Sequence, residues 1–182
     1  MANLRNLIIE ALPELQLIGN EDYKQAVVDI WEEAYRESGW EHIEDVPKND
    51  IVTAFSNLQH TRSVTLQAIA CADIIEKIHR ISVNRDDLIT ASLLHDISKC
   101  FEYAREGKHK TRYAKLMQHG VYTVHKAIEH RLPLEIQHMI VTHTVASKIL
   151  PQTVEALILH YVDYLDSDIL LHAINKPIFL KK

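Results

Sequence analysis

Apolar residues recur at helical spacing along most of the chain. One set, between Asn20 and Gly39, comprises Ala26, Val27, Ile30, Trp31 and Ala34. A second set, over 61–79, comprises Val64, Ala68, Cys71, Ala72, Ile75 and Ile78, and a third, after Asn84, comprises Leu88, Ala91, Leu94 and finally His95. Asparagine is a favoured N-cap residue, and an apolar stripe at this spacing faces a core, so the pattern predicts three core-facing helices.

The rest of the chain shows helical signals separated by turn residues. Helices are predicted over 111–130, with an interruption at Gly120, and over 134–144 and 152–165, which open with Pro133 and Pro151 at a permitted first-turn position. The stretch 50–60 predicts a helix that breaks near His60, and 167–182 predicts a short one that ends before Pro177. Residues 40–49 and 99–110 are polar and aperiodic and predict loops. The whole pattern predicts an all-α fold.

Composition narrows the class of protein further. Four glycines and five prolines among 182 residues argue against a turn-rich β-sandwich or barrel, and the length predicts one domain over 1–182. A formal net charge of −5 lacks the basic character that constitutive nucleic-acid binding requires. With two cysteines and no apolar run typical of a signal peptide or membrane span, the sequence predicts a cytoplasmic protein.

Histidine is the unusual feature of the composition, with twelve residues in the chain. Two neighbours, His95 and Asp96, follow directly on the apolar run that ends in Leu93 and Leu94. A carboxylate carried into a core needs a cationic partner or a metal. Imidazole and carboxylate together suit Fe, Mn, Zn or Co when no thiolate is offered. The doublet is therefore a candidate metal site.

Together with His60 upstream and Asp163 downstream, this doublet resembles the HD-domain superfamily of metal-dependent phosphohydrolases. His60 precedes His95 by 35 residues, and Asp163 follows Asp96 by 67. The resemblance spans 60–168 and implies a compact all-α helical bundle, with residues 1–59 as an N-terminal helical extension. That fold agrees with the helices predicted above.

The resemblance also implies a metal-ligand set. His60, His95, Asp96 and Asp163 would hold one divalent ion, and Asp96 would bridge to a second ion held by His119 and His143. The ions, one or two per chain, would be drawn from Fe, Mn, Co, Zn, Ni and Mg. Three nearby histidines offer substitutes for the second pair: His125, His130 and His138.

Lys99, three residues after Asp96, gives the His-Asp-x-x-Lys variant of the family motif. A lysine there is a suitable point charge for phosphate, so Lys99 and Asp96 are the expected catalytic residues. Arg62 and Lys99 are the expected substrate-binding residues, although either could instead neutralise a carboxylate such as Glu102. The resemblance implies that metal-activated hydroxide cleaves a phosphoester or phosphoanhydride of a small, nucleotide-like phosphorylated substrate.

Two other functions share this motif. Some HD-fold proteins with the same six ligands are di-iron oxygenases, and an HD domain can also act as a non-catalytic module that senses a nucleotide. The first sixty residues carry amphipathic helix surface that could form a homodimer. These alternatives stay open at the level of sequence.

Overall fold

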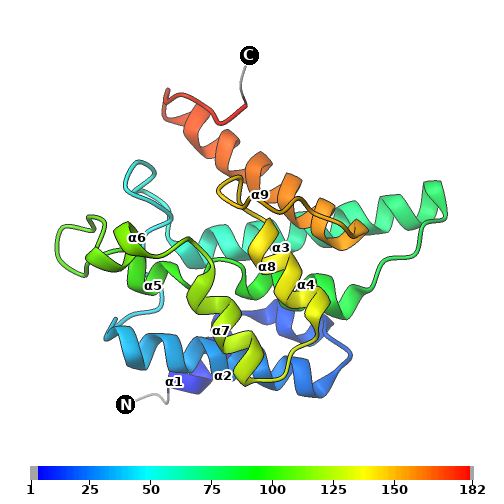
Figure 1. The fold of residues 1–182 in the computed structure, drawn as a ribbon, viewed down its shortest axis with the longest axis horizontal. Coiled ribbons are helices and arrows are strands. Elements are labelled where there is room, and N and C mark those ends of the chain that lie inside the picture. Colours follow the sequence, from blue (N-terminus) through cyan, green and yellow to red (C-terminus); the bar gives the residue numbers. More distant parts are fainter. Residues whose placement is uncertain (1–3, 181–182) are drawn as a thin grey trace.

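The computed structural model describes residues 4–180, and within this range its regular structure is helical (Figure 1). The α-helices, in chain order, are α1 Leu4–Ala11, α2 Glu21–Ser38, α3 Asn57–Ile74, α4 Arg85–Leu94, α5 Lys99–Glu102, α6 Arg112–Leu116, α7 Val121–Glu129, α8 Leu134–Thr142 and α9 Val154–Ala173. A 3₁₀ helix, Pro13–Leu17, follows α1, and a π-helical turn, Ile75–His79, extends α3. The prediction of an all-α fold is confirmed.

Helix α4 is the centre of the bundle. It packs against α2, α3, α8 and α9, and all of its residues from Asp87 to Leu94 are buried. The Trp31 indole of α2 donates a hydrogen bond of 2.9 Å to the carbonyl of Leu93. Because α4 is covered on all sides, the residues that directly follow it, His95 and Asp96, are placed in the interior.

The stretch 50–60 is not the separate helix that its sequence predicts. The Asn49 side chain accepts hydrogen bonds from the amides of Ile51 and Val52, which holds the chain in a turn. Helix α3 begins only at Asn57, where Ser56 and Gln59 form a reciprocal capping box. His60 therefore lies in the first turn of a continuous helix rather than at a break.

Two other boundaries differ from the prediction. Within the predicted loop 99–110, Lys99–Glu102 forms the short helix α5. It forms because backbone hydrogen bonds between residues i and i+3 continue without a break from the turn at His95–Ser98. The predicted helices over 152–165 and 167–182 are one helix, α9, since neither Gly nor Pro interrupts Val154–Ala173. The chain leaves α9 just before Asn175, which has a positive φ of 57°.

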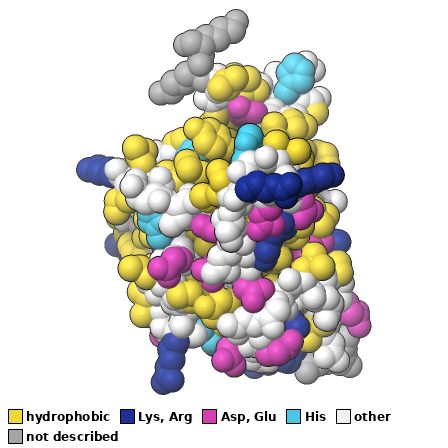
Figure 2. Space-filling view, turned by 90° about the vertical axis from the view of Figure 1, so that its right-hand side faces the viewer, with side chains coloured by type: hydrophobic (Ala, Val, Ile, Leu, Met, Phe, Trp, Pro, Cys, Tyr) yellow, Lys and Arg dark blue, Asp and Glu magenta, His cyan; other side chains and the backbone are white. Residues whose placement is uncertain are grey.

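The surface is mixed in character. On the face drawn in Figure 2, apolar side chains are interspersed with Asp and Glu, which gather near its middle, and Lys and Arg project at scattered points. Among the described residues, none of the helices has both the length and the apolar character needed to cross a bilayer.

Gly120 separates α6 from α7 in a conformation that favours glycine. Its φ is +88°, and a Cβ added there would lie 3.2 Å from the carbonyl oxygen of Ile140. We expect Gly120→Ala to lower the free energy of unfolding by about 1–2 kcal/mol, the cost of the left-handed conformation for a residue with a side chain. Urea denaturation measures this loss.

Gly19→Ala is the matched control, because its added Cβ meets only the Asp86 carboxylate, at an ordinary contact distance of 3.4 Å. Its free energy of unfolding should stay within about 0.5 kcal/mol of the wild type. Equal stability of the two variants would contradict the conformational requirement at Gly120.

Candidate metal centre

Four buried residues from separate parts of the chain form a first donor group: His60, His95, Asp96 and Asp163. His60 comes from the first turn of α3, His95 and Asp96 follow α4, and Asp163 lies on α9. His60 Nε2 is 3.0 Å from Asp163 Oδ1 and 3.2 Å from Asp96 Oδ2. One potential ligand atom of each residue lies within 4.8 Å of the other three, which is close enough for a single ion to reach all of them.

Asp96 also belongs to a second donor group, with His119 and His143. His119 Nε2 is 2.9 Å from Asp96 Oδ1 and 3.0 Å from His143 Nε2. The other oxygen, Asp96 Oδ2, faces His60 and His95. The two carboxylate oxygens of Asp96 thus point into different donor groups, which is the arrangement of a bridging carboxylate.

The four histidines of the two donor groups are oriented alike, each by a hydrogen bond from Nδ1. The Nδ1 atom of His60 donates to Asp166 (2.6 Å) and that of His119 donates to Glu102 (2.6 Å). The Nδ1 atoms of His95 and His143 donate to backbone carbonyls three residues earlier in their own helices, each at 2.7 Å. Since these acceptors carry no proton, each ring turns Nε2 toward Asp96, as metal-ligating histidines do.

His95 Nε2 tests directly whether a metal fits this centre. It is buried and has no hydrogen-bond partner among residues 4–180, although it lies 3.4 Å from Asp96 Oδ2. A buried polar atom without a partner costs free energy unless a ligand satisfies it. A divalent ion in the first donor group would do so, and the oxygen and nitrogen donors are those that such ions accept.

Asp96 and His143 have the protonation states that metal ligands need, whereas His119 is protonated in the metal-free centre. Burial raises the pKa of Asp96, but Lys99 and the surrounding histidines outweigh it and hold that pKa well below its usual range. Burial and the neighbouring His119 lower the pKa of His143 to about 3, so its ring is neutral. For His119, hydrogen bonds to Asp96 and Glu102 overcome the effect of burial and raise the pKa to about 9.

Two lysines neutralise the carboxylates of the centre. The Lys99 ammonium forms a short ion pair with Asp96 Oδ2. Lys48, which sequence reasoning missed, lies 2.5 Å from His60 Nε2 and 3.6 Å from Asp163 Oδ1. Burial lowers the pKa of Lys48 to about 8. No motif or periodicity marks Lys48, because it lies in the aperiodic segment 40–49.

Supporting residues were also outside the predicted set. Asp166 holds His60 and accepts further hydrogen bonds from Ser63 and Gln67. Its place three residues after Asp163, on the same face of a helix, is the signal that could have identified it. Glu102, considered only as a carboxylate to be neutralised, instead orients His119.

Arg62, expected to bind substrate, forms an ion pair with Glu14: its Nη2 and Nε donate to Oε1 at 2.9 and 3.0 Å, and Nε also donates to Oε2 at 3.2 Å. This pairing gives no support to a substrate contact. The three histidines considered as substitutes also lie outside both donor groups. His125 pairs with Glu129, His130 with Glu33, and His138 accepts from the amide of Gln152.

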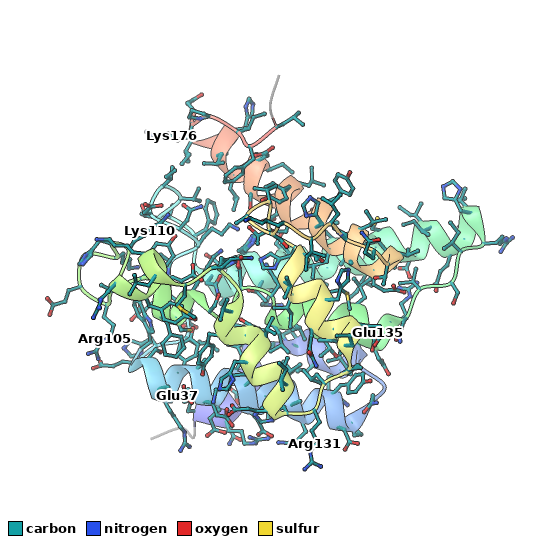
Figure 3. The ribbon with its side chains drawn as sticks, in the orientation of Figure 1. Glu37, Arg105, Lys110, Arg131, Glu135 and Lys176 are labelled. Carbon is teal, nitrogen blue, oxygen red and sulfur yellow. The ribbon has the colours of Figure 1, made fainter. Side chains whose placement is uncertain are left out.

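A cavity of about 370 Å³ opens beside the second donor group. Residues far apart in sequence line it: Asn49, Asp50, Ile51, Lys99, Glu102, Tyr103, Lys110, Ala114, Met117, His119 and Phe179. Lys110, one of these lining residues, lies on the same side of the molecule as Lys176 of the C-terminal segment (Figure 3). The cavity joins Lys99 and His119 to a wall of mixed apolar and polar side chains, so a ligand with an anionic end and an organic body would fit it.

Comparison with known proteins identifies the family. The chain matches the HD domain over residues 57–168 and belongs to the HD-domain family, as the sequence predicted. It is also similar to a dihydroneopterin 2′,3′-cyclic phosphate phosphodiesterase of Methanocaldococcus jannaschii, with 33% identity over 115 residues. This alignment covers 62% of the chain and 46% of the relative. No solved structure gave a significant match.

We expect metal analysis to separate the two donor groups. Wild-type protein loaded with Mn²⁺ should hold about two ions per chain, in the manner of two-metal hydrolases. His119→Ala should hold about one, and Asp96→Ala should hold none, since it removes the ligand that the two groups share. Inductively coupled plasma mass spectrometry after removal of free metal measures the content.

His125→Ala is the matched control, since His125 lies on α7 near His119 in sequence but outside both donor groups. Its metal content should equal that of the wild type. Full loading of Asp96→Ala would contradict the bridging geometry.

Asp166→Asn tests the support of His60. An amide in place of the carboxylate weakens the hydrogen bond that fixes the ring, and losses of this kind cost about 10- to 100-fold in metal affinity. Competition with a chromophoric chelator measures the dissociation constant. Asp168→Asn is the control, since Asp168 lies on the same helix but accepts hydrogen bonds from the amides of Phe179 and Leu180, outside both donor groups. Identical affinities for the two variants would show that Asp166 does not support the ligand.

Proposed function

We propose that this chain is a metal-dependent phosphohydrolase that cleaves a phosphoester of a small, nucleotide-like substrate. The observation that carries the proposal is the position of Asp96, whose two oxygens face two separate groups of histidine Nε2 atoms. Two divalent ions held there would supply Lewis acidity, which lowers the pKa of water and polarises a phosphoryl oxygen. Membership of the HD-domain family supports the same chemistry.

The protein itself would supply orientation and charge. Lys99 lines the cavity and already contacts Asp96, so its ammonium can neutralise a phosphoryl oxygen beside the donor groups. Glu102 fixes the ring of His119, and Asp166 fixes that of His60. Because these supports are in place in the folded chain, little reorganisation is needed when charge develops on the phosphoryl group.

The cavity suggests where the rest of the substrate binds. Tyr103, Met117 and Phe179 offer apolar contact to a flat ring, and Asp50 and Lys110 offer polar groups at its edges. The relative's name specifies a cyclic phosphate carried by a pterin, which is a flat heterocycle with a phosphoester. We propose that a heterocyclic 2′,3′-cyclic phosphate is the first substrate class to test.

The test is hydrolysis of 2′,3′-cyclic AMP, a 5′-nucleoside monophosphate and bis(p-nitrophenyl) phosphate by protein loaded with Mn²⁺, Fe²⁺ or Zn²⁺. We expect turnover of at least one phosphoester by the wild type and none by Asp96→Ala. Lys99→Met should lower kcat by about 100-fold, the usual effect of removing one group that stabilises the transition state. Lys115→Met, an exposed lysine on α6, is the control and should retain the wild-type kcat.

The competing functions give different results in the same preparation. Consumption of oxygen by the reduced, iron-loaded protein without phosphate release would favour an oxygenase. Tight nucleotide binding without turnover under any metal would favour a sensing module. Either result would overturn the proposed hydrolase activity.

A further inference from the structure

Lys48 is a buried ammonium group inside the first donor group, only 4% exposed. Its Nζ lies 2.5 Å from His60 Nε2, 3.6 Å from Asp163 Oδ1 and 3.9 Å from Asp96 Oδ2. Three of the four residues that would hold the first ion are therefore within 4 Å of the Lys48 ammonium. The Lys48 ammonium therefore lies where the ligands of the first ion would converge.

The contact between Lys48 and His60 would make the ammonium compete with a metal ion for one ligand atom. His60 Nδ1 donates to Asp166, so the ring presents Nε2 to the donor group, where it lies 2.5 Å from Lys48 Nζ and 3.0 Å from Asp163 Oδ1. A metal ion held by His60 would need the Nε2 lone pair. The Lys48 ammonium and an ion on Nε2 would occupy the same space, so binding of the ion would move the ammonium away.

Backbone hydrogen bonds hold Lys48 in place, so displacement of its ammonium would involve movement of the side chain alone. The Lys48 amide donates to the Phe55 carbonyl (3.2 Å), and the Asn57 amide donates to the Val46 carbonyl (2.7 Å). These bonds tie the segment to the start of α3, which carries His60. The displaced ammonium would therefore stay within the reach of its own side chain, close to the cavity that Asn49 and Asp50 line.

The charges in the centre indicate which kind of group the displaced ammonium would contact. In the metal-free centre, the ammonium groups of Lys48 and Lys99 pair with the carboxylates of Asp163 and Asp96. Each divalent ion that enters adds positive charge to a buried region, which is costly unless an anion follows it. A phosphoryl group is such an anion, and a lysine ammonium is a suitable point charge for it.

We propose that Lys48 occupies the first metal site in the metal-free protein and becomes a phosphate-binding residue when the ion displaces it. This role rests on the proposed metal-dependent hydrolase function. The proposed role gives Lys48 two opposite effects: the residue weakens binding of the metal and strengthens binding of phosphate. Loss of folding alone would weaken both.

The experiment compares metal-stripped wild type, Lys48→Met and Lys48→Gln by calorimetric titration with Mn²⁺. Both variants should bind the first ion at least about ten-fold tighter than the wild type, because the competing cation is gone. With Mn²⁺ saturating, both should bind inorganic phosphate about ten-fold more weakly. The rise in melting temperature on adding Mn²⁺ should also be larger for the variants than for the wild type.

Lys126→Met is the matched control. Lys126 is another buried lysine, but its ammonium pairs with Glu33, Glu37 and Glu129, none of which belongs to either donor group. Its removal should leave the affinity for Mn²⁺ unchanged. A similar gain in Lys126→Met would mean that the effect does not come from the position of Lys48, and would overturn the proposal.

The outcomes separate this role from the function on which it rests. Affinity for Mn²⁺ that is equal to or weaker than the wild type in both Lys48 variants overturns the competition with metal. Unchanged phosphate affinity overturns the second role. A wild type that binds no Mn²⁺, Fe²⁺ or Zn²⁺ overturns the metal centre, and the role of Lys48 with it.

Discussion

The rest of the structure depends on the burial of one ionised carboxylate, that of Asp96. A carboxylate removed from water costs several kcal/mol unless cations and hydrogen-bond donors surround it. Here the compensation comes from Lys99 and from imidazoles on α3, at the end of α4, before α7 and at the end of α8. The helices that supply these groups must therefore meet around the end of α4, whose residues from Asp87 to Leu94 are all buried.

Two kinds of hydrogen bond orient the four histidines toward Asp96. His95 and His143 end their helices and bond to carbonyls of their own last turns, so their orientation is fixed locally. His60 and His119 need carboxylates supplied by other elements, Asp166 on α9 and Glu102 on α5. The second kind of support links the geometry of the centre to correct packing of the whole bundle.

In the proposed hydrolase, the same charges would favour an anionic substrate. Two lysines pair with two ionised carboxylates before any metal enters, and a cavity with both apolar and polar walls adjoins Lys99 and His119. Metal ions would add positive charge in a buried region. A phosphoester would offset that charge, in keeping with the proposed phosphohydrolase function.

The sequence alone determined the helical class, the core faces of α2, α4 and the first part of α3, and the doublet at the end of α4, because apolar periodicity and a charged pair after an apolar run are local signals. The prediction of Ile78 as a core residue is wrong, because Ile78 lies in the π-helical turn after α3, which has no buried residue. The resemblance to the HD-domain family implied His60, His119, His143 and Asp163 as partners for that doublet. Only the tertiary structure decided that Asp96 faces two groups, that Arg62 pairs with Glu14, and that Lys48 enters the centre. These contacts join residues distant in sequence, and no local preference of the chain encodes them.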